Sequence, residues 1–196
     1  MSLTFEELPL RPETKAALKE HGFASPFPIQ EMVLPIALAD GDVIGQAKTG
    51  TGKTLAFGIP LIERVIAPKD SEWPGLAHQG LPQVLVVVPT RELCIQVAKD
   101  IDELAGNRGI RTLAVYGGRA FEPQIDSLNA GIEIVVGTPG RLLDLYRQGA
   151  LRFEQVVALG ELQISWVGSD EGEILVTDEF DIPVISIDET VEGENV

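Results

Sequence analysis

The chain has 196 residues, 44% of them hydrophobic, which is enough for one globular domain with its own core. It contains no run of 18 apolar residues, so the sequence excludes helical membrane spans and predicts no membrane partner. The formal net charge is −15, but residues 157–196 hold 11 acidic residues and no Lys or Arg; the nearly balanced remainder excludes nucleic-acid binding through bulk positive charge.

Helical and extended patterns alternate along the first 150 residues. Helices show apolar residues three and four apart, and strands are short runs rich in β-branched residues. The predicted elements are a helix over 12–20, a helix over 29–38 that Pro35 should disturb, a strand over 42–45, a helix after residue 54, a strand over 84–88, a helix over 92–104, a strand over 112–116, a helix over 121–128, a strand over 132–136 and a helix over 141–146. This alternation predicts an α/β fold, a mainly parallel sheet with helices on both faces.

The pattern changes after residue 157. Three short apolar runs are separated by turn residues and acids, and they lie at 162–167, 174–176 and 184–187. We expect short strands in a meander there, and disorder over 192–196. The sequence therefore divides into a domain over 1–157 and an acidic tail over 158–196, whose strands complete or extend the sheet.

A glycine-rich segment, Ala-Lys-Thr-Gly-Thr-Gly-Lys-Thr at 47–54, joins the first predicted strand to its helix. Gly50 and Gly52 let successive backbone N–H groups point into one hollow, and the helix dipole adds to the attraction for anions. Lys53 reaches the β- and γ-phosphates, and the Thr54 hydroxyl binds Mg²⁺. The segment predicts a nucleoside triphosphate with Mg²⁺ and makes these two residues catalytic candidates. The alternative is a glycine-rich turn without a ligand.

Further motifs lie where predicted strands end, which is where open α/β sheets bind ligands. They are Pro89-Thr90-Arg91, Gly117-Gly118-Arg119 and Thr138-Pro139-Gly140-Arg141, with Gly22-Phe23, Pro26 and Gln30 upstream of the glycine-rich segment. With these motifs in this order, residues 3–157 resemble the N-terminal, ATP-binding RecA-like domain of a DEAD-box RNA helicase. The resemblance implies ATP and Mg²⁺ as cofactors and RNA as partner.

The resemblance assigns the adenine to Gln30, whose amide both donates and accepts, with Phe23 in the same motif and Phe5 as an aromatic near the base. The residues implied to hold the triphosphate and the metal are Thr49, Gly50, Thr51, Gly52, Lys53 and Thr54. Two alternatives stay open: Phe5 packs in the core, and Gln30 is a surface amide of its helix. Phe27 stands where the family usually has Ser or Thr, so we expect one polar contact to the loop to be lost.

The same resemblance implies that the strand-end motifs grip the sugar-phosphate backbone of RNA. The residues concerned are Pro89, Thr90, Arg91, Gly117, Gly118, Thr138, Pro139, Gly140 and Arg141. Backbone N–H groups, a Thr hydroxyl and guanidinium groups suit phosphates and carry no base specificity. We therefore expect weak, sequence-independent binding of single-stranded or structured RNA. The alternative is that Arg91, Arg119 and Arg141 are ordinary surface charges.

The sequence departs from the family at the strand that begins near residue 158. The family has Asp-Glu-Ala-Asp there, whereas residues 158–163 read Ala-Leu-Gly-Glu-Leu-Gln. Only an assumed deletion of two residues aligns Glu161 with the catalytic glutamate, and the metal-binding aspartate is still missing. We also expect the chain to lack the family's Ser-Ala-Thr motif and second RecA-like domain. Hydrolysis of ATP should then be near background.

Two later segments, 174–179 and 184–189, are apolar runs that end in Asp-Glu. Pairing of either segment beside the strand before the glycine-rich loop would supply a substitute carboxylate. The alternative that we favour is a meander whose strands end in solvated charge.

The leading hypothesis is a truncated DEAD-box-like domain that binds ATP with Mg²⁺ and holds RNA weakly without unwinding it. One alternative is a regulatory module whose acidic tail covers the RNA-binding arginines or binds a protein partner, and another is a truncated product without function. The N-terminus lacks the basic and apolar regions of a signal peptide, and the lone Cys94 lies in a helical apolar pattern typical of a core residue. We therefore expect a cytoplasmic protein.

Overall fold

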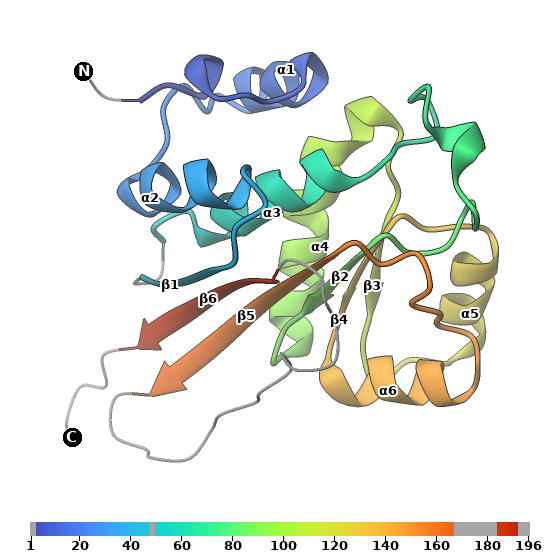
Figure 1. Ribbon diagram of the computed structural model, residues 1–196. Helices are drawn as coiled ribbons and strands as arrows, with labels where there is room; N and C mark the ends of the chain where they lie inside the picture. The colour runs from blue at the N-terminus through green and yellow to red at the C-terminus, as the bar shows by residue number, and fades with distance from the viewer. Residues whose placement is uncertain (1–2, 48–49, 167–183, 192–196) are drawn as a thin grey trace.

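The computed structural model describes residues 3–47, 50–166 and 184–191, which form one layered α/β unit (Figure 1). Its strands are β1 (Val43–Ala47), β2 (Val84–Val87), β3 (Thr112–Val115), β4 (Ile134–Gly137), β5 (Ala158–Trp166) and β6 (Val184–Val191). Its α-helices are α1 (Pro12–Glu20), α2 (Pro28–Ala37), α3 (Lys53–Arg64), α4 (Arg91–Ala105), α5 (Glu122–Asn129) and α6 (Pro139–Arg147). Short 3-10 helices lie at Phe5–Glu7, Trp73–Gly75 and Gly106–Arg108.

The described strands form one sheet in the order β1-β6-β5-β2-β4-β3, and every neighbouring pair is parallel. The predicted α/β fold is confirmed. The predicted meander is wrong, because the first and third strands of a meander do not pair with each other, whereas β5 and β6 pair directly and in parallel. The predicted run at 174–176 lies outside the described residues. Apolar, β-branched runs such as the start of β6 suit a parallel strand with neighbours on both sides. Part of the acidic tail therefore builds the middle of the sheet.

Helices cover both faces of the sheet, with α3 and α4 on one face and α5 and α6 on the other (Figure 1). Successive residues of a strand point to opposite faces, and β2 shows the consequence. Val84 and Val86 belong to the core shared with α1 to α4, whereas Leu85 and Val87 pack against a second core that includes residues of α5 and α6. The chain thus buries apolar side chains on both faces, as the alternation of elements predicts.

The helix α2 continues past Pro35 to Ala37, so the predicted disturbance does not end it. A proline removes one backbone hydrogen bond, and near the last turn this loss affects few residues. Burial of Val33, Leu34 and Ala37 against the core offsets that cost. No helix among the described residues is long and apolar enough to cross a membrane.

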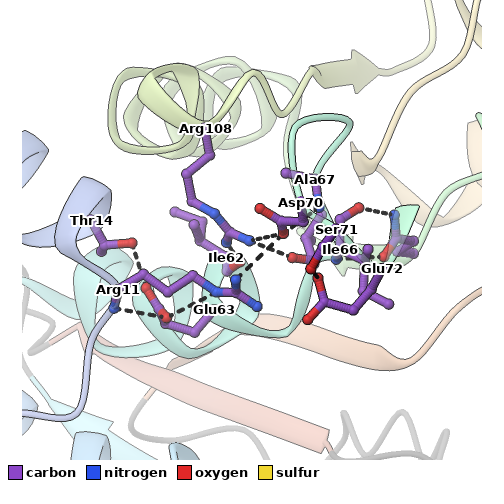
Figure 2. A network of polar contacts seen from close by, with 12 residues as sticks. Arg11, Thr14, Ile62, Glu63, Ile66, Ala67, Asp70, Ser71, Glu72 and Arg108 are labelled. Atoms are coloured by element: carbon purple, nitrogen blue, oxygen red, sulfur yellow. Dashed lines mark hydrogen bonds and ion pairs between the residues drawn. The ribbon is translucent and has the colours of Figure 1, made fainter. Parts of the chain in front are cut away.

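A network of polar contacts, in which Arg108 is buried and Arg11 is more exposed, joins the start of α1, the end of α3 and the turn after α4 (Figure 2). Arg108 is 2% exposed and donates to the carbonyls of Ile62 and Val65, at 2.5 and 2.7 Å, where α3 ends. Its guanidinium also pairs with Asp70 at 2.8 Å. Glu63 accepts hydrogen bonds from the Arg11 backbone and the Thr14 hydroxyl. The network holds the end of α3 that lies opposite the glycine-rich loop.

Candidate functional site

The glycine-rich loop leads directly from β1 into α3. Gly50 and Gly52 have φ angles of 74° and 79°, a left-handed conformation that a side chain would strain, and Gly52 is the N-terminal cap of α3. Lys53 is 7% exposed, and its ammonium donates to the Ala47 carbonyl at 2.8 Å. Thr49 lies outside the described residues. The loop thus places a buried cation and the positive end of a helix at the carboxyl edge of the sheet.

The loop borders a cleft of about 570 Å³ between α3, α4 and the segment that joins α1 to α2. Its lining residues are His21, Phe23, Phe27, Gly50, Gly52, Lys53, Thr54, Leu55, Leu93, Gln96, Asp100, Glu103 and Leu104. Five residues predicted for the nucleotide are among them, namely Phe23, Gly50, Gly52, Lys53 and Thr54. The cleft thus brings an aromatic ring, a cation and the loop backbone to one place.

The cleft also offers oxygen atoms to a magnesium ion. Mg²⁺ usually takes one or two protein oxygens and completes its shell with phosphates and water. The Thr54 hydroxyl and the Asp100 carboxylate are such oxygens. Among the described residues, no group of three or more His, Cys, Asp or Glu side chains is placed to hold a metal. The residues present therefore fit a metal that arrives with a nucleotide.

Gln30 connects the segment before α2 to the glycine-rich loop. Its side chain is buried, its carbonyl oxygen accepts from the Phe27 backbone at 2.9 Å, and its amide nitrogen donates to the Gly52 carbonyl at 2.8 Å. It does not line the cleft. In this structure Gln30 therefore holds the glycine-rich loop from a buried position outside the cleft lining. Its contact with adenine stays a prediction.

The three phenylalanines near the cleft have different surroundings. Phe5 is 3% exposed and belongs to the core, which is the place that the core alternative assigned to it. Phe23 is partly buried, and Phe27 is 48% exposed; both line the cleft. Phe27 lies against Gly52. According to the resemblance, the usual residue at position 27 is Ser or Thr. The aromatic surface nearest the loop therefore comes from Phe23 and Phe27.

The sequence patterns did not single out the polar face of α4. Gln96, Asp100 and Glu103 line the cleft opposite the start of α3. Burial raises the pKa of the Asp100 carboxyl, with a smaller contribution from Glu103, and the hydrogen bond from Thr54 opposes the shift. Spacings of four and three residues mark these side chains as one helix face. The sequence alone does not show which element this face meets.

A second hollow, of about 640 Å³, lies at the ends of β2, β3 and β4. Its lining residues are Pro89, Thr90, Arg91, Glu92, Gly117, Phe121, Thr138, Gly140, Arg141 and Asp144. All three predicted backbone-gripping motifs thus converge on it, although Gly118 and Pro139 are not part of the lining. Parallel strands end at the same edge of a sheet, which explains the convergence.

Arg141 is the buried cation of this hollow. It is 7% exposed, its Nη2 donates to the Arg119 carbonyl at 2.9 Å, and its guanidinium carbon lies 4.0 Å from the centre of the Phe121 ring. Its Nη1 is buried and has no hydrogen-bond partner among the described residues. The guanidinium of the exposed Arg91 lies against Gly118. A buried guanidinium with an unused donor suits an anionic ligand such as a phosphate.

The three acidic residues of β5 and β6 lie at different places in the sheet from those that the sequence predicted. Glu161 lies within β5, level with Val87 of β2 and Ser186 of β6. In β6, Asp188 is level with Gln46 and Glu189 with Ala47, directly beside the strand that enters the glycine-rich loop. The second Asp-Glu segment, 174–179, lies outside the described residues. Segment 184–189 therefore pairs beside the strand that precedes the glycine-rich loop. This is the pairing that the sequence analysis named as the less favoured of its two alternatives.

Cys94 lies in the core, as its helical pattern predicts. Its side chain is buried, its Sγ lies 3.2 Å from the Val136 carbonyl, and burial raises the pKa of the thiol to about 11. At pH 8 only about one thiol in a thousand is then ionised. We expect Ellman's reagent to label the native protein slowly and the urea-unfolded protein at once. Immediate stoichiometric labelling of the native protein would contradict a core position.

Comparisons with known proteins agree with this geometry. The family profile described as DEAD/DEAH box helicase matches residues 27–182. The chain is 41% identical over 157 residues to the DEAD-box ATP-dependent RNA helicase CshA of Streptococcus pneumoniae, which covers 80% of this chain and 28% of that protein. It is 41% identical over 155 residues to the ATP-dependent RNA helicase RhlB of Shewanella frigidimarina, covering 79% and 35%. The chain thus spans about a third of the length of these relatives.

Solved structures show the same fold. A DEAD box protein from the hyperthermophile Methanococcus jannaschii superposes with a TM-score of 0.77 at 34% identity, covering 96% of this chain and 50% of that one. A hypothetical ATP-dependent RNA helicase from Sulfolobus tokodaii superposes with a TM-score of 0.72 at 27% identity, covering 92% and 50%. The described residues therefore form a RecA-like domain.

Proposed function

This chain belongs to the DEAD/DEAH box helicase family, and on that premise we propose that its RecA-like domain binds ATP with Mg²⁺ in the cleft beside the glycine-rich loop and RNA backbone in the hollow around Arg141. The observation that carries the proposal is the loop itself, with two left-handed glycines, a buried Lys53 and a helix that begins at the same point. A loop of this kind presents backbone N–H groups and positive charge to a triphosphate.

The second part of the proposal is that the chain hydrolyses ATP only near the background rate and does not unwind RNA. The family positions its catalytic Asp-Glu on the strand that corresponds to β5, and residues 158–163 contain Glu161 as the only carboxylate. A positioned general base contributes about 10²- to 10⁴-fold to a rate. The binding of ATP depends less on β5 than its hydrolysis does, because most contacts to the triphosphate come from the loop and Lys53.

Calorimetric titration of the chain with ATP and with GTP tests the binding, and a phosphate-release assay with and without RNA tests the hydrolysis. We expect ATP to bind with Mg²⁺, GTP to bind more weakly, and RNA to leave turnover near background. Robust RNA-stimulated turnover that disappears in Lys53→Ala would contradict the second part of the proposal while supporting the first.

Arg141→Met should weaken RNA binding about 10- to 100-fold, because a hydrogen-bonded guanidinium–phosphate contact is worth about 1.5–3 kcal/mol. The slope of log affinity against log salt concentration should fall by about 0.7, the value for one lost contact to a single strand. Fluorescence anisotropy with a labelled oligonucleotide measures both quantities.

Arg147→Met is the matched control, since Arg147 lies on the same helix but is exposed and does not line the hollow. Both variants need an unfolding curve, because Arg141 is buried. Equal affinities for Arg141→Met and the unaltered chain would exclude Arg141 from the RNA contact.

A further inference from the structure

The ring of Phe121 contacts the buried cation of the hollow at the ends of β2, β3 and β4. The guanidinium carbon of Arg141 lies over that ring, 4.0 Å from its centre, and both residues line the hollow. The face of an aromatic ring carries partial negative charge, which attracts a cation within about 6 Å of the ring centre. Phe121 and Arg141 therefore interact electrostatically as well as by packing.

A ring contact fixes a guanidinium without using its hydrogen-bond donors. The N–H donors of an arginine point outward in the plane of the guanidinium, whereas an aromatic ring takes one face of that plane. In Arg141, Nη2 donates to the Arg119 carbonyl at 2.9 Å, and Nη1 has no hydrogen-bond partner among the described residues. The ring and the carbonyl thus hold the guanidinium while one donor stays unused.

Phe121 is itself held in place by the start of α5. Its carbonyl accepts from the backbone N–H groups of Gln124 and Ile125 at 3.0 and 2.9 Å, and the preceding carbonyl, of Ala120, accepts from the Gln124 side chain at 2.9 Å. The Phe121 side chain packs against the core that includes residues of α5 and α6. A helix terminus and a core therefore set the position of the ring.

The charge of Arg141 is poorly compensated inside the protein. The residue is 7% exposed, so its guanidinium has lost most of its contact with water. Asp144 lines the same hollow, but the ion pairs of the described residues do not include Arg141. The Phe121 ring offsets part of the cost of burial without neutralising the charge, which stays available to an anion.

We propose that Phe121 is the residue that positions Arg141 for the RNA backbone, because its ring orients the guanidinium so that the unused donor meets a phosphate. This inference rests on the proposed function, since it requires RNA in this hollow. Phe121 has no donor of its own to offer a phosphate. It acts through Arg141 and is therefore a positioning residue.

A second role for an aromatic ring in an RNA site has to be distinguished. Aromatic side chains in sites for single strands stack directly on bases. In this hollow Arg141 already lies over the Phe121 ring, and Phe121 is half-buried. We therefore assign Phe121 to the positioning of Arg141 and make direct stacking an outcome of the test.

The test measures RNA affinity by fluorescence anisotropy at several salt concentrations, with labelled oligouridine and labelled oligoadenosine as probes. The variants are Phe121→Leu, Phe121→Tyr, Arg141→Met, the double variant Phe121→Leu with Arg141→Met, and Phe153→Leu. Phe153 is the matched control, since it packs against the same core and stacks on Tyr146 at 5.1 Å, but does not line the hollow. An unfolding curve accompanies each variant, and Phe121→Met replaces Phe121→Leu if the latter does not fold.

For Phe121→Leu we expect affinity to fall about 3- to 10-fold with both probes, the usual size of a partly desolvated cation–π contact. Leucine keeps the apolar packing and removes the ring, so part of the change in salt slope expected for Arg141→Met should appear as well. Phe121→Tyr should restore affinity, and Phe153→Leu should resemble the unaltered chain. In the Arg141→Met background, Phe121→Leu should cause no further loss, because the two residues act as one unit.

Three results would overturn the assignment: an unchanged affinity in Phe121→Leu, an equal loss from Phe121→Leu with and without Arg141, or a failure of Phe121→Tyr to restore binding. An equal loss that is larger for oligoadenosine than for oligouridine would show direct stacking on bases. If the unaltered chain binds neither probe, the proposed RNA site fails too, whereas normal binding by the unaltered chain with any of the three results removes only the role of Phe121.

Discussion

Lys53→Ala should weaken the binding of ATP about 30- to 1000-fold, which corresponds to about 2–4 kcal/mol. Among the described residues that line the cleft, Lys53 is the only Lys or Arg, whereas Asp100 and Glu103 bring negative charge. Without the ammonium, the triphosphate meets loop N–H groups and two acids. The effect should therefore be larger in EDTA than with Mg²⁺, since the metal screens the phosphates from the acids. Calorimetry under both conditions measures it.

Two controls make this result specific. Lys53→Met keeps most of the buried side chain and removes only the charge, so it should behave like Lys53→Ala. Lys69→Ala removes an exposed lysine outside the cleft lining and should leave ATP affinity unchanged. If ATP affinity survives in Lys53→Met, the cleft does not bind the triphosphate in the proposed way.

Arg108→Met should lower the free energy of unfolding by about 3–5 kcal/mol, the typical cost of removing one partner from a buried ion pair. Two carbonyls at the end of α3, those of Ile62 and Val65, lose their donor. Among the described residues, Asp70 keeps Arg11, at 3.5 Å, as its ion-pair partner. A domain of this size is usually stable by only about 5–15 kcal/mol, so the loss is a large fraction. Urea unfolding followed by circular dichroism measures it.

The matched control is Arg11→Met, which removes a more exposed partner of the same network. The Arg11 side chain is 39% exposed and its ion-pair distances are 3.5 and 3.7 Å, so its loss should cost less than about 1 kcal/mol beyond its packing. If Arg108→Met lowered the free energy of unfolding less than Arg11→Met does, burial would not determine how much each arginine contributes to stability. Because Arg108 holds the end of α3 opposite the loop, ATP affinity of Arg108→Met should be normal at temperatures where it remains folded.

The position of β6 changes how the acidic tail must be tested. The regulatory alternative suggests removing residues 158–196, but that cut also removes β5 and β6 from between β1 and β2. Loss of two central strands would unfold the sheet and mimic any functional effect. Neutralising the acids at positions 170–181 while keeping both strands is the cleaner experiment, with RNA affinity at several salt concentrations as the measurement.

Local patterns in the sequence determined most of the secondary structure and the nature of the first site. The helix predicted over 12–20 is α1, and the apolar run predicted over 84–88 contains β2. The glycine-rich segment with Lys53 and Thr54 also needed no structure, because its backbone conformation and its chemistry come from neighbouring residues. These features depend on contacts within a few positions, which a linear pattern records directly.

Tertiary structure alone decided the features that depend on distant partners. An apolar run ending in Asp188-Glu189 has the same pattern in a meander as in an interior parallel strand, and only pairing with β1, about 140 residues earlier, distinguishes them. Gln30 reaches Gly52, and Asp100 and Thr54 line one cleft, because separate elements pack together. The sequence by itself thus determined the α/β fold class and a loop whose residues suit a nucleoside triphosphate. Long-range packing, which no local pattern encodes, decided which strands and helices lie beside the loop.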